Sequence, residues 1–288
     1  MTESNTGAKR PHEAIDDETS EASIDPNNIS ELGQQHDMRT AVSGRTFGGA
    51  PHQTTAYFKD LERYLIKHIT ESDVVAGAVA WLTSESIIAT LAQKRCALVV
   101  QKEDFLRPDL PSSGTGDLAQ KLAALYTTIK HGIEKQHLAE FMVSHVSSNL
   151  SLDDPIRCVG NLNTDKNPAH PKMHNKFLVF CKERMVERQL NPTTGEFEWT
   201  DKSIPYGEWT SEMDTDNTEW FYEIHPYAVW TGSFNFTQVA THSFENAVYI
   251  ENDEIATAYM MEFGHIYALS EPLNWQSEWM EPQFRIGT

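Results

Sequence analysis

Two pairs of polar side chains stand where a buried β-strand would carry apolar ones. His174 and Lys176 are two residues apart, and Ser233 and Asn235 are also two apart. Because alternate residues of a strand share a face, each pair should project from one face of a strand. Together they offer an imidazole that can act as nucleophile or base and three hydrogen-bond donors, which are the groups that phosphoryl transfer needs. A His-x-Lys pair alone is also common on exposed strand edges, so the indication comes from the combination.

Three segments carry a resemblance to a known family. They are MHNKFLVF (173–180), TGSFNFT (231–237) and FENAV (244–248). Their combination resembles the single-motif bacterial endonuclease branch of the phospholipase D superfamily, whose pattern is His-x-Lys, an Asp after four intervening residues, Gly-Ser-x-Asn, and a Glu ahead of a final strand. The resemblance covers residues 57–273 except 182–227, and the matching residues are His174, Lys176, Gly232, Ser233, Asn235 and Glu245.

The chain departs from the family pattern at two places. Cys181 stands where the family has its Asp, and 50 residues (182–231) separate Cys181 from Gly232, where the family has a short turn. Three explanations stay open for the missing carboxylate. An Asp of the long segment, Asp214 or Asp216, takes its role, or the site works without it, or the site is degenerate and inactive.

The resemblance implies a mechanism that uses no metal ion and no cofactor. His174 attacks a phosphodiester to form a phosphohistidine, a second His protonates the leaving oxygen, and water releases the phosphate. The chain has one convincing His-x-Lys, so a homodimer with its two-fold axis through the active site would supply the second His. Lys176, Ser233 and Asn235 would hold the non-bridging oxygens. Glu245 would accept a proton from the far ring nitrogen of a catalytic His and fix its tautomer.

The motif specifies the bond that is cleaved and not the molecule that contains it. Members of the superfamily cut DNA, RNA or phospholipids, or transfer phosphatidyl groups. Because the match is with the nuclease branch and no membrane anchor is evident, we expect a nuclease whose substrate is DNA rather than RNA. The alternatives are a phospholipid hydrolase or phosphatidyl transferase, and a catalytically silent binding protein.

The apolar pattern predicts the elements that position these residues. Helical spacing begins at Thr54, a possible N-cap, and a second helix opens at Ser84. Further helices are expected over 118–135 and 253–269, and strands over 73–82, 96–101, FMVSHV (141–146), IRCVGN (156–161), the segment from Met173, 227–237 and 245–251. This alternation predicts an α/β fold with a mixed β-sheet flanked by helices on both faces.

Two segments are expected to lie outside the regular fold. Residues 1–50 are polar and acidic with almost no large apolar residues, so they are predicted to be a disordered tail ahead of a catalytic domain over 51–288. Residues 182–227 hold 4 basic and 11 acidic side chains and should form an insertion with a hairpin. Because both of its ends lead into strands that carry candidate residues, we expect it at the rim of the site, as an acidic lid that repels long DNA.

Composition sets the remaining limits. The chain has 288 residues and a net charge of -19, but residues 41–181 carry a net charge of only +1. The acidity is therefore local and leaves a polyanionic substrate open. Cys96, Cys158 and Cys181 form neither a disulfide framework nor a metal knuckle and are expected to be reduced. There is no run of 18 apolar residues and no apolar segment near the start, so a cytoplasmic location is predicted.

Other groupings of chemical interest are weaker. His170 and His174 have the spacing of zinc ligands on a helix, but Pro171 and the strand pattern that follows disfavour a helix there. The tryptophans of the insertion could stack nucleobases or pack it against the domain. His242 is a minor alternative partner for Glu245. Core packing or a surface position is expected for the rest, which are Phe234, Phe236, His265 and Tyr267.

Overall fold

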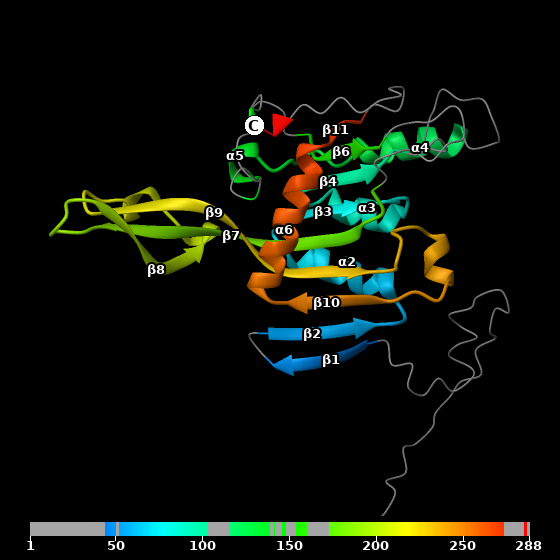
Figure 1. The fold of residues 1–288 in the computed structure, drawn as a ribbon, viewed down its shortest axis with the longest axis horizontal. Helices are drawn as coiled ribbons and strands as arrows, with labels where there is room; N and C mark the ends of the chain where they lie inside the picture. The colour runs from blue at the N-terminus through cyan, green and yellow to red at the C-terminus, as the bar shows by residue number, and fades with distance from the viewer. Residues whose placement is uncertain are drawn as a thin grey trace, which may run out of the picture.

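The computed structural model of the chain describes residues 44–49, 52–102, 116–138, 141, 146–147, 154–160, 173–273 and 285–286. These residues build a ten-stranded sheet in the order β1-β2-β10-β9-β7-β3-β4-β6-β11, and β8 pairs with β7 outside this path (Figure 1). Its strands are β1 (Gly44–Gly49), β2 (His52–Tyr57), β3 (Val74–Val79), β4 (Arg95–Gln101), β6 (Ile156–Val159), β7 (Lys176–Leu190), β8 (Phe197–Pro205), β9 (Thr218–Gly232), β10 (Ala247–Glu251) and β11 (Glu271–Pro272). A separate pair is formed by β5 (Val146–Ser147) and β12 (Arg285–Ile286).

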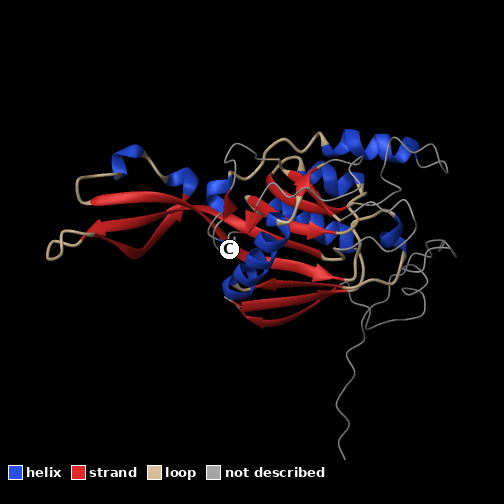
Figure 2. Cartoon of the chain, turned by 45° about the horizontal axis from the view of Figure 1, so that its top comes forward, coloured by secondary structure: helices blue, strands red, loops and turns tan. Residues whose placement is uncertain are grey.

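The sheet is mixed. β4 lies parallel to both β3 and β6, while β7 runs antiparallel to β3 and β9 antiparallel to β7. Helices cover both faces (Figure 2). On one face lie α2 (Leu61–Glu71), α3 (Glu85–Leu91) and α4 (Gly116–Tyr126), and on the other lie α6 (Asp253–Ala268) and the short α5 (Lys135–Leu138). The predicted α/β fold with helices on both faces is therefore confirmed.

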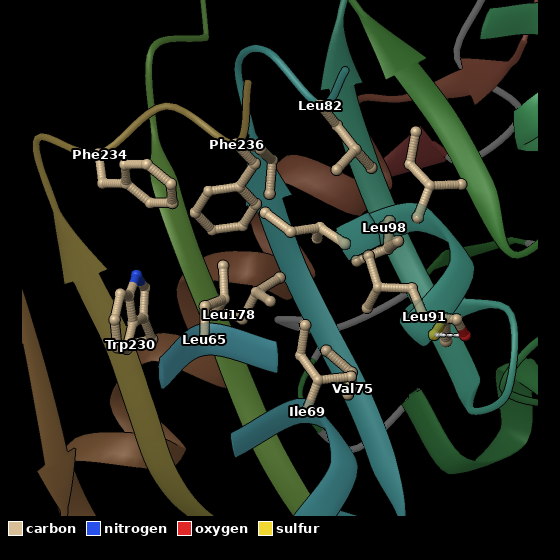
Figure 3. Close-up of a cluster of buried hydrophobic side chains, with 14 of the residues drawn as sticks. Leu65, Ile69, Val75, Leu82, Leu91, Leu98, Leu178, Trp230, Phe234 and Phe236 are labelled. Carbon is tan, nitrogen blue, oxygen red and sulfur yellow. Dashed lines mark hydrogen bonds between the residues drawn. The ribbon is translucent and has the colours of Figure 1, made fainter. Parts of the chain in front are cut away.

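Side-chain alternation along the central strands builds two buried clusters. Val75 and Leu178 pack toward α2 and α3, whereas their neighbours Val74 and Val179 pack toward α6. Because both faces are covered, the β3 sequence VVAGAV is buried at every position and does not alternate with polar residues. Figure 3 shows the first cluster, with Phe234 and Phe236 at one end of it beside Leu178 and Trp230.

The sequence-based prediction is wrong at the start of the domain. A strand occupies Gly44–Gly49, within the segment that was expected to be a tail, and pairs with β2. The segment from Thr54 to Tyr57 belongs to β2, and the helix α2 begins only at Leu61. β2 pairs with β1 on one side and β10 on the other, so ladder pairing overrides the local helical spacing. Residues 1–43 lie outside the described residues.

Two other expected elements differ in extent. The helix expected over 118–135 ends at Tyr126, where Thr127 and Thr128 hydrogen-bond through their hydroxyls to the carbonyls of Ala124 and Leu125. Such local bonds compete with helix continuation. Of the strand expected over 141–146, only Val146 lies in a strand among the described residues.

The insertion 182–227 forms a three-stranded ribbon. β7 and β9 run on without a break beyond the core sheet, and β8 pairs with the outer part of β7. The 3-10 turns η3 (Tyr206–Glu208) and η4 (Ser211–Met213) lie between β8 and β9. The predicted hairpin is thus part of a larger structure, which projects from one end of the sheet (Figure 1).

Candidate functional site

The candidate residues gather at one end of the central strands. Lys176 begins β7 opposite Val79, the last residue of β3. Phe177 pairs with Thr231, so Lys176 lies beside Gly232 at the end of β9. This is the edge at which the parallel strands β3, β4 and β6 present their carboxyl ends, where ligands bind in open α/β sheets. The structure therefore brings the two motif segments together.

Lys176 and His174 are in direct contact. The Lys176 Nζ lies 3.3 Å from Nδ1 and 3.2 Å from Nε2 of His174, and 3.1 Å from the His174 carbonyl oxygen. Near-equal distances to both ring nitrogens place the ammonium over the ring, not in line with either lone pair. His174 is exposed, whereas Lys176 is only 8% exposed, and burial lowers the Lys176 pKa while the charge of Glu245 opposes that shift. A cation held at the base of an exposed imidazole suits an anionic substrate.

Gly232 sits where β9 and β10 come closest. A Cβ on this residue would lie 2.3 Å from the Asn246 carbonyl oxygen, and its φ of +154° disfavours other residues. The same carbonyl accepts hydrogen bonds from the backbone N–H groups of Ser233 (3.0 Å) and Phe234 (3.4 Å). The glycine thus allows the turn that leads into Ser233 and Asn235, at the sheet edge where Lys176 lies.

Replacement of Gly232 by alanine should disturb this turn. We expect Gly232→Ala to lower the free energy of unfolding by roughly 1–3 kcal/mol, because the new methyl group meets backbone atoms that cannot move alone. Gly207→Ala is the matched control, since a Cβ on Gly207 would meet no other atom within 4 Å. Urea unfolding of both variants measures the difference, and equal stability would show that the turn tolerates a side chain.

Ser233 and Glu245 form a fixed pair across the β9–β10 connection. The Ser233 hydroxyl donates to Glu245 Oε2 and accepts from the Asn246 backbone N–H at 3.1 Å. The carboxylate therefore has a neutral hydroxyl partner from the Gly-Ser-x-Asn segment. The orienting contact between Glu245 and a catalytic His stays a prediction.

Asn235 lies between two anchored aromatic residues. Phe234 and Phe236 are 1% and 0% exposed and pack in the core, as expected (Figure 3). The residues that alternate with them, Ser233 and Asn235, are more exposed. The Asn235 Oδ1 is buried and has no hydrogen-bond partner among the described residues. Buried unsatisfied polar atoms are rare, and a catalytic role is one reason for them to persist.

The connection between β3 and α3 is a part of the site that sequence reasoning missed. The Ala80 N–H donates to the Asn175 carbonyl at 2.8 Å, and the N–H groups of Thr83 and Ser84 donate to the Phe236 carbonyl at 2.8 and 2.9 Å. This connection therefore clamps both motif segments. Its Trp81 ring lies edge-to-face with His174, with centroids 5.7 Å apart. The signal in the sequence was a Trp that follows a buried strand immediately before a helix N-cap.

The two departures from the family pattern meet at one structural feature. β7 pairs Phe180 with Ala228 but Cys181 with Pro226, so β9 has an extra residue, Tyr227, at this point. This bulge marks the boundary between core sheet and ribbon. Cys181 is fully buried against the α6 face, and burial raises its thiol pKa. Because the strand continues as the ribbon, position 181 is enclosed in apolar packing that suits a thiol better than a carboxylate.

The ribbon does not border the site, so the lid prediction is wrong. Lys176 is at the site end of β7, and the ribbon begins at residue 182, six residues away, or about 20 Å along the strand. Figure 1 shows the ribbon on the left and the β9–β10 connection on the right of the sheet. β7 and β9 each carry candidate residues at one end and continue into the ribbon at the other end. Asp214 accepts from the Trp220 backbone N–H within the ribbon, so it does not replace the missing Asp.

The tryptophans of the ribbon and the remaining His and Tyr candidates lie outside the candidate site or in packed positions. Trp220 is 8% exposed and Trp209 is half-buried in the ribbon, whereas Trp199 is 62% exposed. Tyr267 is buried beneath Arg157, and His265 lies on the surface of α6 beside Glu262. Across the described parts of the chain, no cluster of three or more His, Cys, Asp or Glu side chains could hold a metal ion; His170 lies outside them. No described helix is long and apolar enough to cross a membrane.

Comparisons with known proteins give distant similarities. No family model matches the chain. "Uncharacterized protein L381" of Acanthamoeba polyphaga mimivirus is 26% identical over 232 residues, which cover 77% of this chain and 67% of that protein.

Three solved structures are similar at low sequence identity. The phospholipase D family member Nuc from Salmonella typhimurium has 13% identity and a TM-score of 0.39, over 76% of this chain and 97% of that chain. NucT from Helicobacter pylori has 11% identity and a TM-score of 0.37, over 77% and 99% of the two chains. Phosphatidylserine synthase from Haemophilus influenzae has 11% identity and a TM-score of 0.41, over 84% and 46%. With TM-scores below 0.5, none of these assigns the chain to a family.

Proposed function

We propose that this protein is a metal-independent phosphodiesterase, and specifically a nuclease that cleaves DNA through a phosphohistidine intermediate. The observation that carries the proposal is the contact of the Lys176 ammonium with the His174 imidazole, directly beside the Gly232–Asn235 turn. One edge of the sheet then carries a nucleophile, a fixed cation, a hydroxyl group and an amide group. These are the parts that an in-line displacement at phosphorus requires.

The chemistry proceeds in two displacements. A ring nitrogen of His174 attacks phosphorus, a P–N bond forms, and the P–O bond to the leaving group breaks while a second His donates a proton to that oxygen. Water then attacks the phosphohistidine, loses its proton to the second His, and releases His174. Lys176 neutralises charge on the non-bridging oxygens throughout, assisted by Asn235, while Ser233 holds Glu245 in place.

The proposed second histidine comes from a partner subunit. A two-fold axis beside His174 would set two copies of the site face to face, so that each His serves as the nucleophile or as the acid for the other. The ribbon supports this arrangement, because it leaves the sheet at the opposite end and does not obstruct the site edge.

Chelation tests the metal-independent mechanism. Because Lys176 and amide donors replace a metal ion as charge stabilisers, cleavage of plasmid DNA should continue at an unchanged rate in excess EDTA. RNA and phospholipid vesicles, assayed in the same buffer, separate the alternatives. Cleavage of vesicles alone would favour the lipid-directed alternative. Loss of DNA cleavage in EDTA that a divalent ion restores would contradict the mechanism, and no cleavage of any substrate would favour a binding protein.

The oligomeric state gives a separate prediction. Light scattering at assay concentration should show a homodimer, and specific activity should fall as dilution drives dissociation, because a lone subunit lacks the second His. Sedimentation at the same concentrations serves as the control for dissociation. A monomer with undiminished specific activity would rule out the composite site.

A further inference from the structure

The ribbon covers one of its faces with its own chain. The turns η3 and η4 pack beside this face, where the Tyr206 ring meets the Tyr222 ring edge-to-face at 5.2 Å. Trp220 is 8% exposed, and the Lys202 ammonium lies 4.8 Å from its ring centroid. This side of the ribbon is therefore partly covered, with Trp220 buried beneath the covering residues.

The opposite face of the ribbon carries an exposed aromatic group. Arg188 pairs with Trp199 across β7 and β8, and Phe221 pairs with Val186 across β7 and β9, which places all of them on one face. The Trp199 and Phe221 rings meet at 5.3 Å, and the Arg188 guanidinium lies 5.1 and 5.4 Å from their centroids. Even so, Trp199 is 62% exposed and Phe221 39% exposed. A preorganised group of Trp, Phe and Arg is the composition typical of protein-binding hot spots.

The charges of the ribbon are arranged so that only negative ones remain unpaired. Each of its four cations has a carboxylate partner, and the pairs are Lys182–Asp73, Arg184–Glu223, Arg188–Glu219 and Lys202–Glu187. The seven carboxylates between Glu196 and Asp216 have no ion pair among the described residues. The whole surplus of -7 therefore lies on residues 196–216, in β8, the turns η3 and η4 and the connections beside them.

The Phe197 ring also lies on the aromatic face of the ribbon, 5.9 Å from the Arg188 guanidinium. We propose that this face of the ribbon, built by Arg188, Phe197, Trp199 and Phe221, docks a second protein whose surface is positively charged and carries apolar side chains. The unpaired carboxylates attract such a partner and accelerate the encounter, and the aromatic side chains bury apolar surface in the complex. Nucleic acid is disfavoured, because its phosphates would meet seven uncompensated carboxylates. A second copy is disfavoured because a two-fold contact would set one acidic ribbon against another. This docking is independent of the proposed cleavage activity.

Binding of designed peptides to the full-length protein tests the proposal. The probes are fluorescent peptides rich in Lys and Arg that also contain Leu and Trp, a second set with Ser in place of Leu and Trp, and an acidic set that keeps the apolar residues. Anisotropy should show the tightest binding for the basic apolar set. The double variant Trp199→Ala with Phe221→Ala should weaken that binding by at least about tenfold. Phe58→Ala, which changes a 49% exposed aromatic residue outside the ribbon, should not.

A charge variant keeps the test valid if the aromatic variant unfolds the ribbon. Glu208→Gln with Glu212→Gln changes two exposed side chains of the turns, and should slow association and flatten its salt dependence. The proposal is overturned if no basic apolar peptide binds more tightly than its Ser-containing or acidic counterpart. It is also overturned if the folded aromatic variant binds as the parent does, or if single-stranded DNA binds the parent and loses that binding in the aromatic variant.

Discussion

His174→Ala should abolish phosphodiester hydrolysis. The variant loses the proposed nucleophile, so the rate should fall by more than the ~10²–10⁴-fold that follows removal of a general acid or base alone. Stability should change little, because the His174 side chain is exposed at the sheet edge. Initial rates on plasmid DNA or on an activated phosphodiester, with thermal unfolding in parallel, measure both effects.

A matched variant separates the loss of the nucleophile from a general loss of histidine. His265→Ala removes an exposed imidazole from α6 that pairs with Glu262 outside the candidate site. It should keep the parental rate. A His174→Ala protein that is folded and retains near-normal activity would place the nucleophile elsewhere, whatever the substrate proves to be.

Introduction of a carboxylate at position 181, where the phospholipase D pattern has its Asp, should damage this protein. We expect Cys181→Asp to lower the free energy of unfolding by about 3–5 kcal/mol, the usual effect of an uncompensated charge in a core. Position 181 is fully buried among apolar side chains on the α6 side, and the nearby Asp73 carboxylate would add repulsion. Chemical denaturation of the parent and the variant measures the change.

Cys181→Ser provides the control for this substitution. It keeps the size of the side chain and adds polarity without charge, so it should cost about 1–3 kcal/mol. A Cys181→Asp protein that is as stable as the parent and more active would contradict this expectation. It would show that activity in the parent is limited by the missing carboxylate. The bulge at Tyr227 would then not enclose position 181 as tightly as the packing indicates.

The sequence alone determined the chemical groups of the candidate site and the type of the fold. His174, Lys176, Ser233 and Asn235 could be recognised because they are polar residues at period two beside apolar runs typical of strands; in the structure they lie at the ends of β7 and β9. The strands β3 and β4, the core parts of β7 and β9, and the helices α3 and α6 were also predictable, because their apolar runs and the N-caps at Ser84 and Asn252 are local signals.

Tertiary structure decided the elements whose local signal was weak or misleading. The helical spacing after Thr54 gave way to strand pairing, because β1 and β10 offer a ladder on both sides of β2. The clamp from Ala80, Thr83 and Ser84 consists of backbone hydrogen bonds between segments more than 90 residues apart. Such bonds cannot be predicted from the types of the residues that form them, because any residue except proline can donate through its backbone N–H.

Tertiary structure also decided where the insertion lies. The sequence indicated that residues 182–227 join two strands that carry the site, but it did not show at which end of those strands the insertion leaves the sheet. β7 carries Lys176 at its first residue and β9 carries Gly232 at its last, so the strands must traverse the whole sheet before the ribbon begins. Strand direction and register are properties of pairing between distant segments. For that reason composition revealed the acidity of the ribbon, and only the fold showed that the ribbon lies at the opposite end of the strands from the candidate site.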